Sequence, residues 1–84
     1  MPYIKQEDRP KFDEHIEALN REVACAGDFN YVVSRLGLAL IAKLGGRYDH
    51  HNTVIGAMEC AKLELYRRRT GPYEDGAIAK NGDI

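Results

Sequence analysis

The sequence of 84 residues lacks the disulfide framework and the zinc-site pattern that often stabilise proteins of this size. It contains only two cysteines, Cys25 and Cys60, which are too few for a disulfide framework. Neither has a second cysteine or a histidine at the spacing of a zinc site. Both are therefore predicted to be buried thiols in the reducing environment of the cytosol.

Long apolar runs and an excess of one charge are also missing. No apolar run reaches the roughly 18 residues of a membrane span, and no charged segment followed by an apolar one opens the chain. Thirteen acidic residues against twelve Lys and Arg give a net charge of −1. This balance argues against a surface built for DNA or anionic lipid. We expect a soluble cytoplasmic protein with no membrane partner, in which any anion-binding role comes from a local cluster.

Apolar residues recur at helical spacing in three segments, which predicts an all-α fold for a single domain over residues 1–84. Helices are expected over about 9–25, 29–44 and 53–69, and each carries an apolar stripe. The stripes are Phe12, Ile16, Leu19 and Val23, then Phe29, Val33, Leu36, Leu40 and Leu44, then Val54, Met58, Ala61 and Leu65. A short link at Gly27-Asp28 favours an antiparallel pair of the first two helices. Residues 70–84 are expected to form a light covering tail or a short fourth helix.

The central segment is apolar on more than one side. Between Phe29 and Leu44 it carries only two charged residues, Arg35 and Lys43, while Tyr31 and Leu38 point away from its main stripe. A helix of this kind must be covered on more than one side. Because so short a chain has few other segments that could cover this helix, the sequence predicts self-association into a dimer or larger assembly.

Glycine and proline mark the expected ends of helices. Gly45 and Gly46 are expected to end the central helix, and Thr70-Gly71-Pro72 the third. Between them, residues 46–51 are expected to form a loop, with a cap at Asn52 or Thr53 starting the third helix. This loop holds His50 and His51, but a metal site needs three or four converging ligands, so a solvated turn is the favoured interpretation.

The third helix contains an unusual group of cations. Ile55 and Tyr66 widen the apolar stripe of this helix on one side. Lys62 and Arg69 project inside the widened stripe, where a helix normally places Leu or Ala, and Arg67, Arg68 and Arg69 follow one another. Such a lysine must extend to water, pair with a carboxylate or meet an anion. Glu59, three residues before Lys62, is the nearest candidate partner. Two interpretations stay open: a Glu59–Lys62 pair at the rim of a helix interface, or cations poised for an anion.

Distinctive segments are spread over the whole chain. They are Met1-Pro2-Tyr3-Ile4, Asn30-Tyr31, Glu59-Cys60-Ala61-Lys62-Leu63-Glu64-Leu65-Tyr66-Arg67-Arg68, Pro72-Tyr73-Glu74-Asp75, and Ile78 with Asn81-Gly82-Asp83. With these segments the chain resembles an uncharacterised family of small proteins encoded by bacteria and their phages. The resemblance implies a bacterial host cell and makes the helical cations and the tail motifs family features, but it implies no activity. The chain departs from the family pattern at Asp28-Phe29 and at Gly76-Ala77.

Three classes of function are compatible with these features. The first is a non-catalytic binding protein in which a phosphorylated or nucleotide-like anion meets Lys62, Tyr66, Arg67, Arg69, Tyr73 and Asn81, because Arg and Lys bind phosphate and Tyr stacks on a base. The second is a protein-protein interaction adaptor. The third is a metal-dependent nucleotide pyrophosphohydrolase, for which Glu14 and Glu17 supply one acidic pair but the third helix supplies no second pair. The sequence therefore predicts no catalytic residue, no bound metal and no cofactor.

Overall fold

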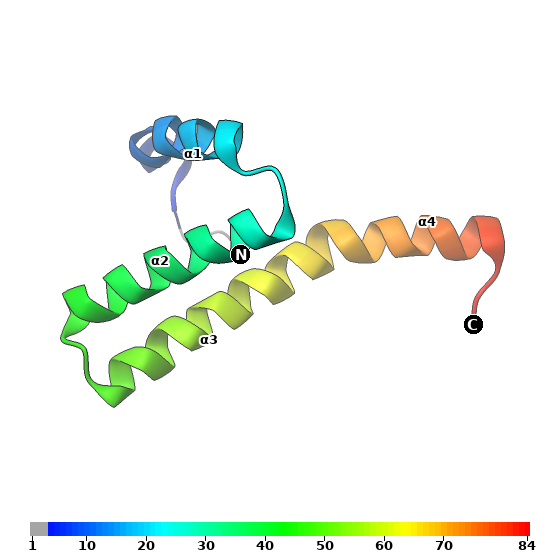
Figure 1. Ribbon diagram of the computed structural model, residues 1–84. Helices are drawn as coiled ribbons and strands as arrows, with labels where there is room; N and C mark the ends of the chain where they lie inside the picture. Colours follow the sequence, from blue (N-terminus) through cyan, green and yellow to red (C-terminus); the bar gives the residue numbers. More distant parts are fainter. Residues whose placement is uncertain (1–3) are drawn as a thin grey trace.

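The computed structural model describes residues 4–84, so the first three residues of the Met1-Pro2-Tyr3-Ile4 segment lie outside the described part. The described residues form helices and no β-strand, which confirms the all-α class. The elements in order are a 3-10 turn η1 (Gln6–Asp8), α1 (Pro10–Glu22), α2 (Ala26–Leu44), α3 (Tyr48–Leu65), a π-helical turn η2 (Tyr66–Thr70) and α4 (Gly71–Asn81) (Figure 1). In this part of the chain, no helix combines the length and apolarity needed to cross a bilayer.

The α2–α3 hairpin is the packed centre of the chain. The two helices run antiparallel side by side (Figure 1), and the hydrophobic side chains buried between residues 4 and 84 are Ile41 and Val54, at 9% and 3% exposure. Gly37 of α2 is buried as well. A Cβ at Gly37 would run into the methyl group of Met58 and would lie 3.4 Å from Val54 Cγ1. The missing side chain therefore lets α3 approach α2 closely.

The turn between these helices depends on two glycines with positive φ. Gly45 has φ 133° and Gly46 has φ 72°, a region that L-residues with side chains rarely adopt. The Gly46 N–H donates to the Ile41 carbonyl at 2.9 Å, and the Gly45 N–H is 3.2 Å from the Ile41 and Ala42 carbonyls. These bonds satisfy carbonyls that would otherwise be left open at the end of α2.

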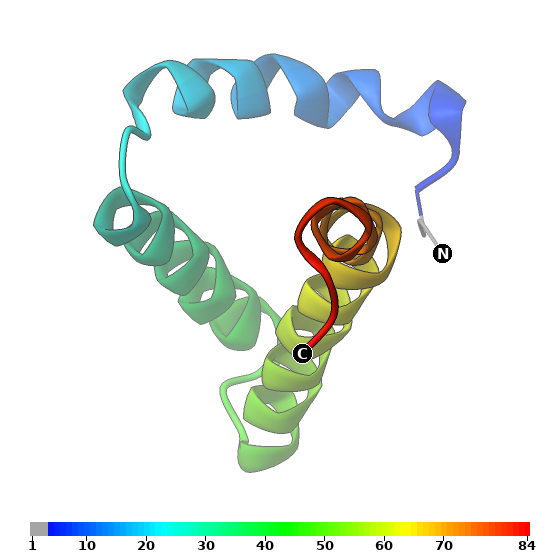
Figure 2. The ribbon, with the colours of Figure 1, turned by 90° about the vertical axis from the view of Figure 1, so that its right-hand side faces the viewer.

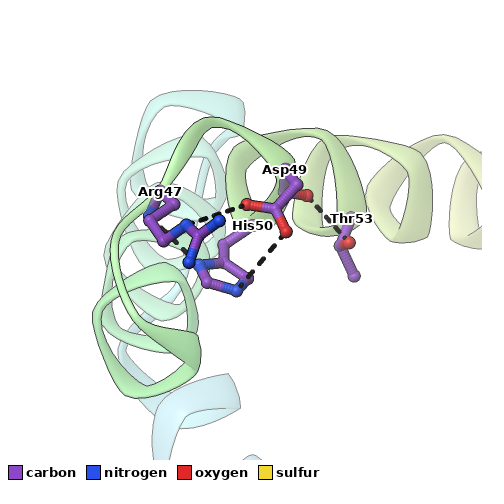
Figure 3. Close-up of polar contacts among 4 residues, drawn as sticks. All are labelled: Arg47, Asp49, His50 and Thr53. Carbon is purple, nitrogen blue, oxygen red and sulfur yellow. Dashed lines mark hydrogen bonds and ion pairs between the residues drawn. The ribbon is translucent and has the colours of Figure 1, made fainter.

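Helix α3 begins at Tyr48, five residues before its expected start, so the expected loop over residues 46–51 is wrong. Figure 3 shows the reason: the Arg47 backbone N–H donates to His50 Nδ1 at 3.0 Å. A ring nitrogen thus caps the helix, whereas Thr53 donates from its hydroxyl to the Asp49 carbonyl at 2.9 Å one turn later. Arg47 Nε lies 3.9 Å from Asp49 Oδ1. Between residues 4 and 84, no three His, Cys, Asp or Glu side chains gather as metal ligands.

The expected short fourth helix is confirmed by α4, but the expected stop at Thr70-Gly71-Pro72 is wrong, because the chain continues through a π turn into α4. Pro72 has no N–H, and in an unbroken α-helix its ring would meet the Arg68 carbonyl. The wider π turn avoids this clash, and the Gly71 N–H bonds to the Tyr66 carbonyl instead. A Cβ on Gly71 would lie 3.3 Å from that carbonyl oxygen. As a result, α3 and α4 form one continuous rod that bends at the π turn, and α4 points away from the hairpin rather than covering it (Figure 1).

Helix α1 stands apart from the rest of the chain, so the expected antiparallel pair of α1 and α2 is wrong. Its Cα atoms lie more than 8 Å from those of α2, α3 and α4, and Figure 2 shows it held across the open side of the other helices. The link is extended at Val23 and Cys25, and Asp28 Oδ2 accepts the Ala24 N–H at 3.0 Å. That bond is the main reason why the pKa of Asp28 lies below its ordinary value. Cys25, expected to be buried, is exposed in this open link.

The close approach at Gly37 generates a first prediction. Gly37→Val should lower the free energy of unfolding by about 1–3 kcal/mol, because overpacking forces α2 and α3 apart. Gly56→Ala is the matched control, since a Cβ there meets nothing within 4 Å. It should stabilise the helix by up to about 1 kcal/mol. Thermal unfolding by circular dichroism at one fixed concentration measures both, and a Gly37→Val protein as stable as the wild type would contradict the packing described.

Candidate anion-binding site

The six side chains expected to bind an anion lie along one rod. Lys62 is on α3, Tyr66, Arg67 and Arg69 are in the π turn, and Tyr73 and Asn81 are on α4. At about 1.5 Å per residue, Lys62 and Asn81 are roughly 28 Å apart along the rod. The expectation that Tyr73 and Asn81 fold back toward Lys62 is therefore wrong, because the helix continues where a turn was expected.

Lys62 is paired within its own helix. Its Nζ lies 2.9 Å from Glu59 Oε1, and the two side chains are 67% and 55% exposed. The interpretation of a Glu59–Lys62 pair is thus confirmed in the chain. A pair this exposed contributes little to stability, so an anion that displaces Glu59 from Lys62 would lose only a small interaction energy.

The three arginines of the π turn fall into two groups. Arg67 and Arg68 lie 3.3 Å and 3.2 Å from the two carboxylate oxygens of Glu64. Glu64, whose side chain is 30% exposed, was missed as a member of the cluster although its spacing of three and four residues was visible in the sequence. Arg69 is exposed and makes no ion pair or side-chain hydrogen bond within residues 4–84. The Glu64 carboxylate therefore faces two guanidinium groups, and Arg69 follows them in the sequence as an exposed cation.

A second contact spans the π turn. The Tyr66 hydroxyl donates a hydrogen bond to Glu74 on α4, eight residues along the chain. In a regular α-helix, two residues that are eight positions apart do not lie close enough for their side chains to meet. The wider π turn between Tyr66 and Glu74 changes the rotation of α4 relative to α3, and so it allows these two side chains to meet. Because the neutral phenol donates to a carboxylate, the pKa of Tyr66 is raised above its ordinary value. Glu74 could not have been found from the sequence without knowledge of the π turn.

Beside the π turn the surface has a hollow of about 570 Å³. Its lining consists of Cys60, Leu63, Glu64, Tyr66, Arg67 and Gly71, so only two of the six expected ligand-binding residues belong to it. Cys60, expected to be buried, is exposed. All these residues come from one stretch of the rod. A single chain therefore offers one wall of a site, on which the Arg67 guanidinium, the Glu64 carboxylate and the Tyr66 ring lie together.

The Tyr66–Glu74 bond generates a prediction about pH. The raised pKa means that folding favours the neutral phenol, so the stabilisation is fully present below pH 10 and is lost as pH rises through the folded pKa. Glu74→Gln should bring the Tyr66 pKa back toward its ordinary value, measured by NMR titration of the ring. Asp75→Asn removes the same charge one residue away and should leave the Tyr66 pKa unchanged. An unchanged titration in Glu74→Gln would show that the bond is absent in solution.

Comparison with known proteins places the chain in a family without assigning an activity. A family model described as "Domain of unknown function (DUF6899)" matches residues 1–84, which is the whole sequence given. No match is found among curated proteins or among solved structures. The match along all 84 residues agrees with the resemblance to an uncharacterised family, and the chain belongs to the family of the domain of unknown function DUF6899.

Proposed function

We propose that the protein is a non-catalytic homo-oligomer that binds an anionic, phosphorylated or nucleotide-like ligand. In a bacterial or phage-infected cell, such a protein would act in the cytoplasm by holding that ligand and so withdrawing it from other proteins. The observation that carries the proposal is the exposure of nearly all large apolar side chains of the single chain.

The exposed area supports self-association. The chain exposes 7598 Å². A compact monomer of its mass, 9.5 kDa, would expose about 5,000 Å². Its radius of gyration of 16.2 Å likewise exceeds the roughly 12 Å of a compact domain of this length. The excess is carried by residues such as Phe29, Leu36 and Leu38, each more than 60% exposed. Exposed apolar surface on this scale marks an interaction site.

The amount of surface favours a second copy of the chain as the partner. Two separate chains expose twice the 7598 Å² of one chain. A compact protein of twice the mass would expose only about 8,400 Å². The difference is at least as large as the 2,000–5,000 Å² or more buried in obligate homodimers. Because the unpaired surface lies on every helix, one copy can cover it more fully than a small peptide can.

The chemistry of the π turn supports the anionic ligand. Arg67, Arg68 and Arg69 follow one another in a turn type that is often found at functional sites. A guanidinium group offers a two-pronged donor that matches phosphate oxygens. Since Arg69 has no acidic partner within residues 4–84 and Glu64 is shared by Arg67 and Arg68, the turn has more positive than negative charge. A neighbouring subunit in the oligomer would supply the second wall that this site lacks.

The two alternatives fare differently. An adaptor that docks a different protein would use the same exposed apolar side chains, and it becomes the better proposal if the chain does not self-associate. A pyrophosphohydrolase would need Glu14 and Glu17 to face a second acidic pair across a helix interface. Both glutamates lie on α1, which packs on no other long helix of the chain, so the structure offers no support for that reaction.

Self-association is tested by sedimentation. The full chain at micromolar concentration should sediment as a dimer or a larger species, because the monomer leaves its apolar surface in water. Native mass spectrometry of protein purified from cells should give the same stoichiometry and report any retained ligand. A well-folded species with the mass of one chain would contradict the proposal, and the protein-protein interaction adaptor would then be the better proposal.

Ligand binding is tested by thermal shift with phosphate, nucleotides and cyclic nucleotides. A ligand at about 100 times its dissociation constant adds roughly 2.7 kcal/mol of stability, which raises the melting temperature by on the order of ten degrees. Lys62→Met and Arg69→Gln should keep the fold and lose most of this shift. Arg21→Gln removes an exposed cation of α1 and is the matched control, which should keep the shift. If no compound moves the wild-type melting temperature, the anionic ligand is ruled out.

A further inference from the structure

Helix α1 has an apolar stripe that none of the helices α2, α3 and α4 of its own chain covers. The stripe is defined by Phe12, Ile16, Leu19 and Val23, which fall on one face at helical spacing. Its three larger members before Val23 are 40–57% exposed, and the helix lies beyond packing distance of α2, α3 and α4 (Figure 2). A one-sided helix of 13 residues has little stability of its own in water, because most helical stability comes from packing an apolar face.

Helix α2 also has an apolar stripe that is left partly uncovered. Phe29, Leu36 and Leu40 lie on the flank of α2 beside its seam with α3, and they are 43–62% exposed. We name these three residues the α2 flank. Within α1, which ends at Glu22, the stripe runs from Phe12 to Leu19, about 11 Å of helix, whereas Phe29 to Leu40 spans about 16 Å of α2. The α2 flank is therefore long enough to receive the helical part of the α1 stripe, and both surfaces are apolar.

The charges of the two helices are complementary. Helix α1 contains Asp13, Glu14, Glu17 and Glu22 against Lys11 and Arg21, whereas α2 contains Arg35 and Lys43 against Asp28. An acidic helix and a basic helix attract each other during encounter. The net charges of the two helices therefore favour the same pairing that the apolar residues favour.

The link between α1 and α2 keeps the two stripes of one chain apart. The backbone is extended at Val23 and at Cys25, and the Ala24 N–H is held by the Asp28 carboxylate at 3.0 Å. A link fixed in this open form leaves the stripe of α1 accessible to another molecule. Exchange of one element between identical chains is a low-cost route to a dimer.

We propose that two copies of the chain exchange their first helices, so that the α1 stripe of each copy packs on the α2 flank of the other. The proposal rests on the self-association proposed above and names the element that produces it. A reciprocal exchange uses the same surface of both copies, as a two-fold symmetric dimer requires. It covers two apolar stripes per chain that the hairpin leaves open.

A pair of matched variants tests the role of the α1 stripe. Ile16→Glu places a charge in the centre of the stripe, whereas Ala18→Glu places the same charge on the far side of the same helix. Sedimentation over a range of concentrations should show a dissociation constant raised at least about tenfold by Ile16→Glu and changed less than about twofold by Ala18→Glu. Circular dichroism should show that the helical content of α2 and α3 persists in both variants.

A mixing experiment tests whether α1 reaches the partner rather than its own chain. In a background with Cys25→Ser and Cys60→Ser, one protein carries Asn20→Cys at the edge of the α1 stripe and the other carries Lys43→Cys at the edge of the α2 flank. The two are mixed, allowed to exchange subunits and treated with a short bifunctional maleimide. Exchange of α1 predicts a covalent dimer containing one chain of each kind. The same two cysteines placed in one chain should likewise give linked dimers.

The outcomes separate the two proposals. A wild-type chain that sediments as a monomer overturns both self-association and helix exchange. An oligomeric wild type whose assembly is equally strong in Ile16→Glu and Ala18→Glu overturns helix exchange alone. Links confined to single chains in the doubly substituted protein, with none in the mixture, show that α1 closes onto its own α2 and also overturn it.

Discussion

The structure depends on how closely α2 and α3 approach at Gly37. Two helices alone bury apolar side chains only along the line where they touch, and here that line is centred on Ile41 and Val54. Without a side chain at Gly37, the methyl group of Met58 fills the space and the helices stay together. The other helices are attached to this hairpin through the chain rather than through packing. The position of α1 and α4 is consequently set by the short segments that connect them.

The sequence predicts the helices because apolar periodicity is a local signal. The stripe of α2, its two charged residues and the glycine pair at its end all follow from spacing and from the conformational freedom of glycine. The same periodicity shows that α2 is apolar on more than one side. Periodicity cannot show which other helix covers each side, and the open position of α1 was missed for that reason. Its cause is a short extended link and one side-chain bond from Asp28 to Ala24.

Other features were missed because they depend on uncommon local geometry. The His50 ring, at the third position of α3, accepts the Arg47 N–H and lets the helix start early, although Glu or Gln is the residue type that usually makes this bond. A proline that normally ends a helix is tolerated at Pro72 because the preceding turn widens. The bond from Tyr66 to Glu74 follows from that widening. Within the candidate site, the Glu59–Lys62 pair was predictable because both residues lie on one regular helix.

The π turn also fixes the rotational register between the two halves of the rod. Successive residues of an α-helix are turned by about 100° around its axis, so the insertion or deletion of one residue near Gly71 would turn every side chain of α4 by about that angle. Tyr73 and Ile78 would then face a different direction relative to α3, although no helix would be lost. The number of residues in the junction 66–72 therefore determines how α4 is rotated about its axis relative to α3. A change of that number would alter which surface α4 presents without altering the fold.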